Sequence, residues 1–232
     1  MLVGAALAAA LPALVLAAAG SGCGESTFDD AADAGGADAD AGDAAHQVSV
    51  TLHPDAAPLP GETKCEVVVT HGIKIPGAKH VDPCTPVKYA TNPPSGGDHW
   101  PIWAAFKAYT IPVPREMYVH DMEHGGVVLA YRCSGACPDV VAMLTDVEET
   151  TKADPACIQA GIKARVVLTP DPKLETPVAA AAWGSTYVAT CLDPASLKQF
   201  VKDSYGKGTE NICGGGLAID ELDGGALCAD GG

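Results

Sequence analysis

The histidines of this chain are concentrated in one stretch, where their spacing could support metal chemistry. Six of the seven lie between residues 53 and 124. In the segment His120-Asp121-Met122-Glu123-His124, the two histidines are four positions apart, so one turn of helix places both imidazoles on the same side. Two imidazoles so placed can bind one metal ion, and the neighbouring Glu123 is a candidate ligand or catalytic base. This segment is the first candidate site.

A third imidazole would complete a three-nitrogen site with an open coordination position, which suits zinc or copper. We predict a metal site made of His99, His120 and His124, with His80, Glu123 and Met122 as auxiliary ligands. The thioether of Met122 and the high rank of copper in the affinity order give copper a slight preference. Two alternatives remain open: the histidines form a polar network that braces the loops, or they perform metal-free acid–base chemistry.

The order His-x-x-Glu-His is also the signature of inverted zinc peptidases, in which the glutamate is the general base. That motif normally lies within a long helix. Here Pro112 and Pro114 precede it and Gly125-Gly126 follows, so we expect at most one helical turn. The context therefore disfavours a peptidase.

A second motif, Cys133-Ser134-Gly135-Ala136-Cys137-Pro138, lies between an expected strand and an expected helix. It resembles the copper site of Sco-type cytochrome-oxidase assembly proteins over about 20 residues. That site also needs a later histidine, which this chain lacks. The sequence favours a structural disulfide between Cys133 and Cys137.

Nine cysteines indicate an oxidising compartment. If Cys23 carries lipid, eight remain for four disulfides: Cys65, Cys84, Cys133, Cys137, Cys157, Cys191, Cys213 and Cys228. Eight cysteines can pair in 105 ways, and the sequence alone does not choose among them. Proximity in sequence nominates the pairs Cys65–Cys84, Cys133–Cys137, Cys213–Cys228 and Cys157–Cys191.

The first 22 residues are predicted to be a lipoprotein-type signal peptide, because an apolar run is followed by small residues and Cys23. Cleavage there would leave Cys23 as a lipidated N-terminus. A secretory signal cut near Ala19 and an uncleaved anchor are the alternatives. All three place the folded part outside the cytoplasm, and the first predicts a lipid-anchored protein of the bacterial cell envelope.

Residues 23–46 are predicted to be a disordered acidic tether of Ala, Asp and Gly. Seven of the 29 acidic residues lie in 24–46, with no Lys or Arg, and the remaining 22 acidic and 14 basic residues give a net charge of −8. With acidic residues in excess, the chain offers no cluster of Lys and Arg side chains of the kind that binds a nucleic-acid backbone. We therefore exclude a nucleic-acid partner and expect a monomeric ectodomain whose membrane attachment is the lipid at Cys23.

Residues 47–232 are predicted to form a single α+β domain of two layers, ending in a Gly-rich tail at 207–232. Residues 72–118 are rich in Pro and Gly, which excludes long helices. Alternation and apolar runs predict strands at 48–52, 66–70, 126–131, 164–169, 178–183 and 186–190. Two main helices are expected at 139–152 and 195–205. This order predicts a mostly antiparallel, disulfide-stapled sheet.

Over residues 79–206 the chain resembles the bacterial domain of unknown function numbered 3105. The resemblance begins at His80-Val81 and is most specific from Pro93-Pro94-Ser95-Gly96-Gly97-x-His99 to His120-x-x-Glu123-His124-Gly125. It implies a shared fold unit, an envelope setting and one recurring motif that contains His80, His99, His120, Glu123 and His124. The family description carries no activity.

We therefore expect an exported, lipid-anchored envelope protein that binds copper or zinc through a histidine cluster. A hydrolase in which a metal or a His/Glu pair activates water, with Glu123 as the candidate catalytic residue, is the first alternative. A structural envelope protein without a ligand is the second.

Overall fold

The computed structural model describes residues 46–222 and 227–228. The predicted signal peptide, the lipidation site Cys23 and the tether up to residue 45 lie outside the described residues. The elements, in chain order, are β1 (Val48–Leu52), β2 (Val67–His71), α1 (Arg115–Glu123), β3 (Val127–Tyr131), α2 (Pro138–Thr150), the 3-10 turn η1 (Ile158–Ala160), β4 (Val166–Pro170), β5 (Val178–Ala182), β6 (Ser185–Ala189), α3 (Pro194–Ser204) and the 3-10 turn η2 (Ile219–Glu221).

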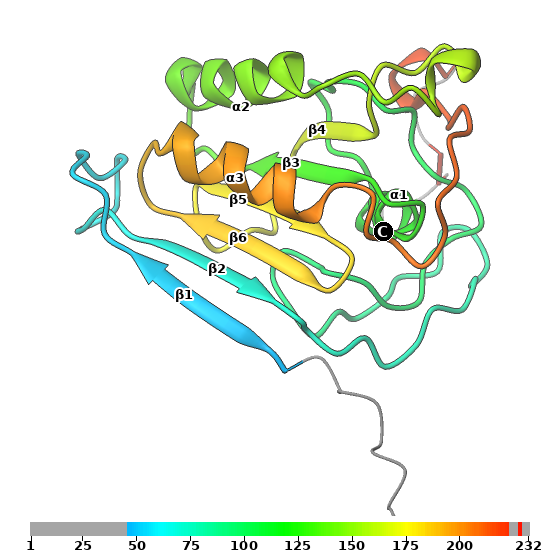
Figure 1. Cartoon of the computed structure of the whole chain (residues 1–232), viewed down its shortest axis with the longest axis horizontal. Helices are drawn as coiled ribbons and strands as arrows, with labels where there is room; N and C mark the ends of the chain where they lie inside the picture. The colour runs from blue at the N-terminus through cyan, green and yellow to red at the C-terminus, as the bar shows by residue number, and fades with distance from the viewer. Residues whose placement is uncertain (1–45, 223–226, 229–232) are drawn as a thin grey trace, which may run out of the picture. The chain divides into compact units, whose positions relative to one another are not determined.

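The strands form one six-stranded sheet in the order β1-β2-β6-β5-β3-β4 (Figure 1). Every pair of neighbouring strands is antiparallel except β3 and β4, which are joined through α2 and run parallel. The prediction of an α+β domain with a mostly antiparallel sheet is confirmed, and the described residues include all six expected strands.

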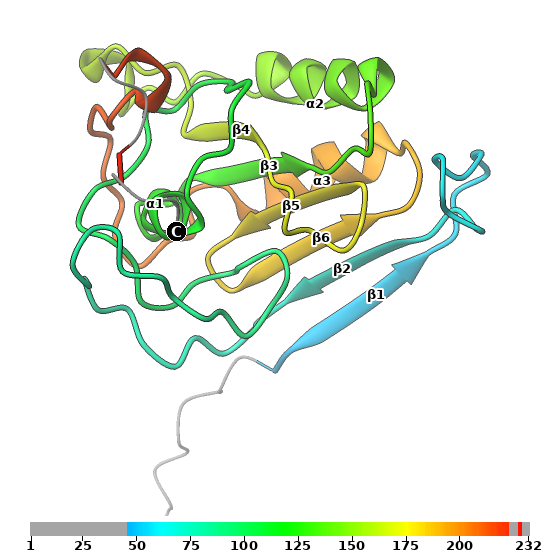
Figure 2. The ribbon, with the colours of Figure 1, turned by 180° about the vertical axis from the view of Figure 1, so that it is seen from behind.

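Both faces of the sheet are covered, because its central strands bury side chains on both sides. Val127 and Leu129 of β3 pack into a core that includes α2 and α3. The alternate residues Val128 and Ala130 pack into a second core with α1. The two expected helices, α2 and α3, thus form one layer, and Figure 2 shows α1 and the Pro/Gly-rich loops on the other side. This further layer was not predicted.

Helix α1 corrects the expectation of at most one helical turn. It has nine residues and begins directly after Pro114, whose fixed φ is tolerated at the start of a helix. It ends in a Schellman motif, in which the N–H groups of Gly125 and Gly126 donate to the carbonyls of Met122 and Asp121 at 2.9 and 2.8 Å. Gly125 has a φ of 83°, which a side chain would disfavour.

The disulfide map confirms one predicted pair and overturns three. Cys133 is bonded to Cys137, as predicted. The predicted pairs Cys65–Cys84, Cys213–Cys228 and Cys157–Cys191 are wrong, and the bonds are Cys65–Cys191, Cys84–Cys228 and Cys157–Cys213.

The sheet explains the first of these corrections. Val67 near the start of β2 pairs with Ala189 at the end of β6, so Cys65 and Cys191 are brought together across 126 positions of sequence. Cys65 and Cys191 pair because they lie at neighbouring strand ends, and their positions in the sequence alone do not reveal this. Four disulfides indicate a protein of a non-cytoplasmic, oxidising compartment. Within the described parts of the chain, no helix combines the length and the apolar character that crossing a bilayer requires.

Candidate metal centre

Two loops that precede α1 in the sequence bring His80 and His99 side by side. These residues form an isolated parallel bridge, in which Val81 N–H donates to the His99 carbonyl at 2.8 Å and His99 N–H donates to the Lys79 carbonyl at 3.0 Å. The Asp98 carboxylate accepts a bond from Lys79 N–H at 2.9 Å. These bonds hold two imidazoles next to each other without a regular strand.

The glycines that precede His99 allow its loop to turn tightly. Gly96 and Gly97 have φ values of 140° and 130°, a region that side chains disfavour. A Cβ at Gly96 would also lie within 3 Å of the Ile75 side chain. The turn brings the Gly97 carbonyl to 2.8 Å from Nδ1 of His99, so the loop itself orients the ring.

Helix α1 supplies the other side of the site and is unusually polar for its position. Every residue from Glu116 to Glu123 is buried, including His120, Asp121 and Glu123. A surface helix normally turns such residues to solvent, and burial without partners is costly. The sequence of α1 is therefore better explained by a site than by packing alone.

Backbone carbonyls fix the tautomers of the two buried rings. Nδ1 of His99 contacts the Gly97 carbonyl, and Nδ1 of His120 contacts the Trp100 carbonyl at 2.7 Å. Because a carbonyl only accepts, each Nδ1 carries a proton, so a metal would meet either ring at Nε2; in this structure Nε2 of His120 lies 3.1 Å from Nε2 of His124. A carbonyl that holds the far nitrogen in this way is the usual support of a metal-bound histidine.

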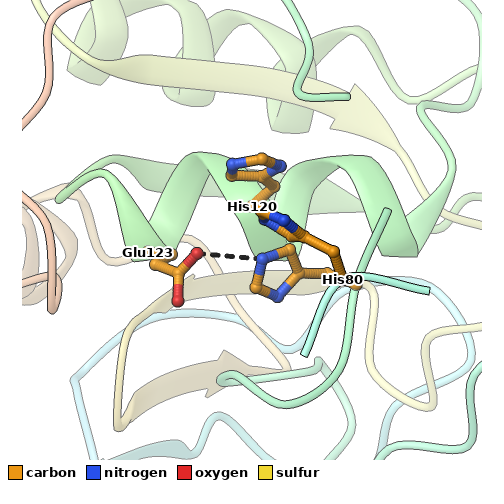
Figure 3. Close-up of side chains that lie close together, drawn as sticks. His80, His120 and Glu123 are labelled. Atoms are coloured by element: carbon orange, nitrogen blue, oxygen red, sulfur yellow. Dashed lines mark ion pairs between the residues drawn. The ribbon is translucent and has the colours of Figure 1, made fainter. Parts of the chain in front are cut away.

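The four residues His80, His99, His120 and Glu123 each offer one ligand atom, and these atoms all lie within 4.8 Å of one another. Nε2 of His99 lies 2.9 Å from Oε2 of Glu123, the ion pair marked by the dashed line in Figure 3. This buried Nε2 nevertheless has no hydrogen-bond partner among the described residues, because the contact lacks the alignment of a hydrogen bond. The nitrogen of His99 and the carboxylate oxygen of Glu123 thus lie close together without an aligned hydrogen bond, a geometry in which both atoms could contact one cation.

Burial is uneven across the cluster. His99, His120 and Glu123 are buried, whereas His80 is exposed. Figure 3 shows His80 on a loop that crosses in front of α1, and His120 and Glu123 on the helix. Three members of the cluster are therefore shielded from solvent, and solvent reaches the cluster at His80.

Burial also sets the charge of the rings on α1. Loss of solvation lowers the pKa of His120 to about 4 and lowers the pKa of His124, so both rings are neutral at pH 7. Only a neutral imidazole nitrogen can bind a metal, so burial keeps His120 in its binding form.

His124, which we predicted as a primary ligand, lies beside the four-residue cluster rather than within it. Its Nε2 is 3.1 Å from Nε2 of His120 and 3.2 Å from Oε2 of Glu210. Its Nδ1 is buried without a partner among the described residues, and its ring lies against Trp103, with centroids 4.7 Å apart. The role of Glu210 was missed, since no motif surrounds it in the sequence.

Met122 and Arg165 also lie at this end of α1. Met122 is fully buried and belongs to the core that α1 shares with the sheet, so its role as a thioether ligand stays a prediction. Arg165 donates to the carbonyl of His124 and to Asp154, and so holds the end of the helix in place. Cys157 and Cys213 also lie near Asp154, but their disulfide removes both thiolates as ligands.

The comparisons with known proteins bear on this arrangement. Searches of curated proteins and of solved structures found no match. A family model described as "Protein of unknown function (DUF3105)" matches residues 80–214, a span that begins at His80 and includes Glu210. All four residues of the cluster therefore lie within the matched segment. By this match, which covers more than half of its length, the chain belongs to the DUF3105 family.

Proposed function

We propose that this protein binds a divalent transition metal through His80, His99, His120 and Glu123. The observation that carries the proposal is the unaligned 2.9 Å contact between Nε2 of His99 and the carboxylate of Glu123, in a site that also holds two further imidazoles. Two buried rings oriented by backbone carbonyls and one exposed histidine support a site that is preorganised yet open to exchange with solvent.

Three nitrogens and one carboxylate oxygen are donors that zinc commonly takes, and imidazole also suits copper. The preference for copper depended partly on Met122, which lies in the core. We therefore propose zinc or copper(II), with the choice between them left to the measurement below. The protein would take up, store or transfer the ion, with His80 as the ligand past which the ion enters and leaves.

The setting that we propose is the bacterial cell envelope, with Cys23 lipidated and the acidic segment acting as a tether. The apolar run before Cys23, the composition of 24–46 and the four disulfides support it. Incorporation of a labelled fatty acid in the producing bacterium tests this; an exported protein that takes up no label would rule the anchor out.

A metal-dependent hydrolase is the second candidate. The pair formed by His124 and Glu210 favours it, because a histidine next to a carboxylate is a common general base and this one adjoins His120. A hydrolase should lose turnover and keep its metal in the variant Glu210→Gln. A binding module should show no turnover of ester, phosphoester or peptide probes with any variant.

The decisive experiment is elemental mass spectrometry on protein exported to an oxidising compartment and then titrated with zinc or copper(II). We expect close to one equivalent of metal in the parent. The double variant His99→Ala/His120→Ala should bind more than about 100-fold more weakly, because it loses two ligands. The matched control is His53→Ala, which removes an exposed histidine outside the cluster and should bind like the parent.

Two results would contradict the proposal. One is a parent that is empty and takes up neither ion. The other is a set of histidine variants that melt at lower temperature by the same amount with metal and with chelator, which would assign the cluster a purely structural role.

A further inference from the structure

Strand β1 forms one edge of the sheet, and all five of its residues are exposed. Its side chains Val48, Val50 and Leu52 are 55%, 49% and 37% exposed, and they belong to a small number of large apolar side chains left exposed in the described residues. In Figures 1 and 2, no other drawn element lies along the outer side of β1. Among the residues that the structure describes, the backbone groups on this side have no strand partner, so another strand could pair with them.

Within the described residues, this edge lacks the features that normally keep edge strands apart. Proteins protect such edges with charged side chains, proline, bulges or a covering segment. Residues 48–52 contain no charge and no proline, and the register with β2 runs without a bulge. An edge of this kind favours pairing rather than solvation.

The apolar side chains of β1 continue an existing core surface. Val48, Val50 and Leu52 stand opposite His71, Val69 and Val67 of β2. Val67 lies in the core beneath α3, and the ring of His71 stacks on Phe200 of α3 at 5.8 Å. The exposed stripe on β1 is thus the outer margin of the α3 side of the sheet.

We propose that β1 is a homodimer interface, in which β1 of a second copy adds antiparallel to form one continuous sheet across both chains. The sequence of the strand favours its own copy. With Val50 opposite Val50, Val48 meets Leu52 and Ser49 meets Thr51, so apolar side chains face apolar ones and hydroxyls face hydroxyls. The flanking residues Gln47 and His53 also meet without opposing like charges. This proposal replaces the expectation of a monomer.

Electrostatics gives the dimer a recognisable salt dependence. The chain has a net charge of −15, whereas the paired strands are neutral. Two copies therefore repel at long range and attract through apolar and backbone contacts at the edge. Since salt screens the repulsion and leaves the contacts, association should strengthen as ionic strength rises.

Disulfide trapping in the full exported chain tests the register. The variant Val50→Cys should give a product of twice the monomer mass on a non-reducing gel, because directly opposed residues of antiparallel strands lie within reach of a disulfide. Ile158→Cys places a thiol at another exposed apolar position, 59% exposed and remote in sequence, and should stay monomeric. Sedimentation of the purified chain should show a dimer that Val50→Lys dissociates and Ile158→Lys does not.

Three outcomes would overturn the proposal. They are a parent that sediments as a monomer at the highest soluble concentration and high salt, equal cross-linking by the two cysteine variants, and a Val50→Cys product whose mass shows a different protein as partner.

Discussion

Asp121 lies next to His120 on α1 and is fully buried, although a carboxylate is costly to bury unpaired. Its Oδ2 accepts a hydrogen bond from Ala104 N–H at 3.3 Å, and its Oδ1 has no partner among the described residues. Loss of solvation therefore raises the pKa of this carboxyl well above 3.8. The folded protein holds a proton here at pH values where the unfolded chain has released it.

This raised pKa predicts how Asp121→Asn should change stability with pH. Below the unfolded pKa of about 3.8 both states of the parent are protonated, and the stabilising effect of that proton is lost as pH rises toward the folded pKa. The amide at position 121 of the variant does not titrate. Between the unfolded and the folded pKa of Asp121, the variant's free energy of unfolding should therefore rise relative to that of the parent by up to about 1.4 kcal/mol per pH unit. Denaturant unfolding of the metal-free proteins measures the difference.

Asp55→Asn is the matched control, because it makes the same substitution at an exposed position. A difference between Asp121→Asn and the parent that stays constant from about pH 4 to 8 would contradict the assignment of a buried, protonated carboxyl.

At the scale of single residues, the sequence predicted that the rings of residues 120 and 124 are neighbours, but not which other side chains gather around His99. The spacing of His120 and His124 correctly indicates neighbouring rings, which lie 3.1 Å apart between their Nε2 atoms. The side chains that could share a cation with His99 are instead His80, His120 and Glu123. Whether residue 123 or residue 124 faces His80 and His99 depends on the bridge between those two loop residues, a contact that no sequence periodicity reveals.

At the scale of elements, the end of α1 depends on a segment near the C-terminus. Residues 206–210 cross this end: Gly206 N–H donates to the Gly125 carbonyl, and Glu210 N–H donates to the Glu123 carbonyl, both at 2.9 Å. Between them, Gly208 lies so close that a Cβ there would meet backbone atoms of Met122, Glu123 and Gly125 at less than 3 Å. These backbone atoms belong to the buried end of α1, so moving them would disturb the packing and hydrogen bonds of the helix.

We therefore predict that Gly208→Ala displaces this segment, lowers the free energy of unfolding by about 1–3 kcal/mol and weakens metal binding through Glu123. Gly215→Ala is the control, since a Cβ at Gly215 meets nothing within 4 Å. Chemical denaturation and metal titration of both variants measure the two effects. Equal behaviour of the two variants would show that the close approach at Gly208 is not maintained in solution.

The elements themselves were largely predictable, with α1 as the exception. Strands and the helices α2 and α3 carry apolar stripes or runs, and the predicted bounds are close to those observed. In α1 the apolar periodicity is interrupted by His120, Asp121 and Glu123, so the signal on which helix prediction depends is weak. Pro114 before it and Gly125 after it were the available signals, and they mark its two ends.

At the scale of the whole molecule, the disulfides differ in how much chain they constrain. Cys133–Cys137 spans only four positions, whereas Cys65–Cys191 spans 126. In the chain-entropy description, closing the short loop contributes about 2 kcal/mol and closing the long one about 5 kcal/mol. The sequence predicted the short pair, and it could not predict long pairs that depend on strand order.

This difference predicts that Cys65→Ser/Cys191→Ser lowers the free energy of unfolding by roughly 2–3 kcal/mol more than Cys133→Ser/Cys137→Ser. Urea unfolding of the two double variants, with the other disulfides intact by mass spectrometry, measures this. An equal or greater loss in the Cys133/Cys137 variant would contradict the prediction and assign that short loop a larger structural role.

The Cys65–Cys191 bond also determines how the domain responds to mechanical load. A pull on the chain at residue 46 acts first on β1, which pairs only with β2 in the sheet and can be peeled from it one residue pair at a time. Peeling then reaches Cys65, where the covalent bond to Cys191 passes the force across to the end of β6 and stops the unravelling. His80, His99, His120 and Glu123 all lie between Cys65 and Cys191, within the loop that this disulfide closes, so the load passes from Cys65 to Cys191 without being carried through them.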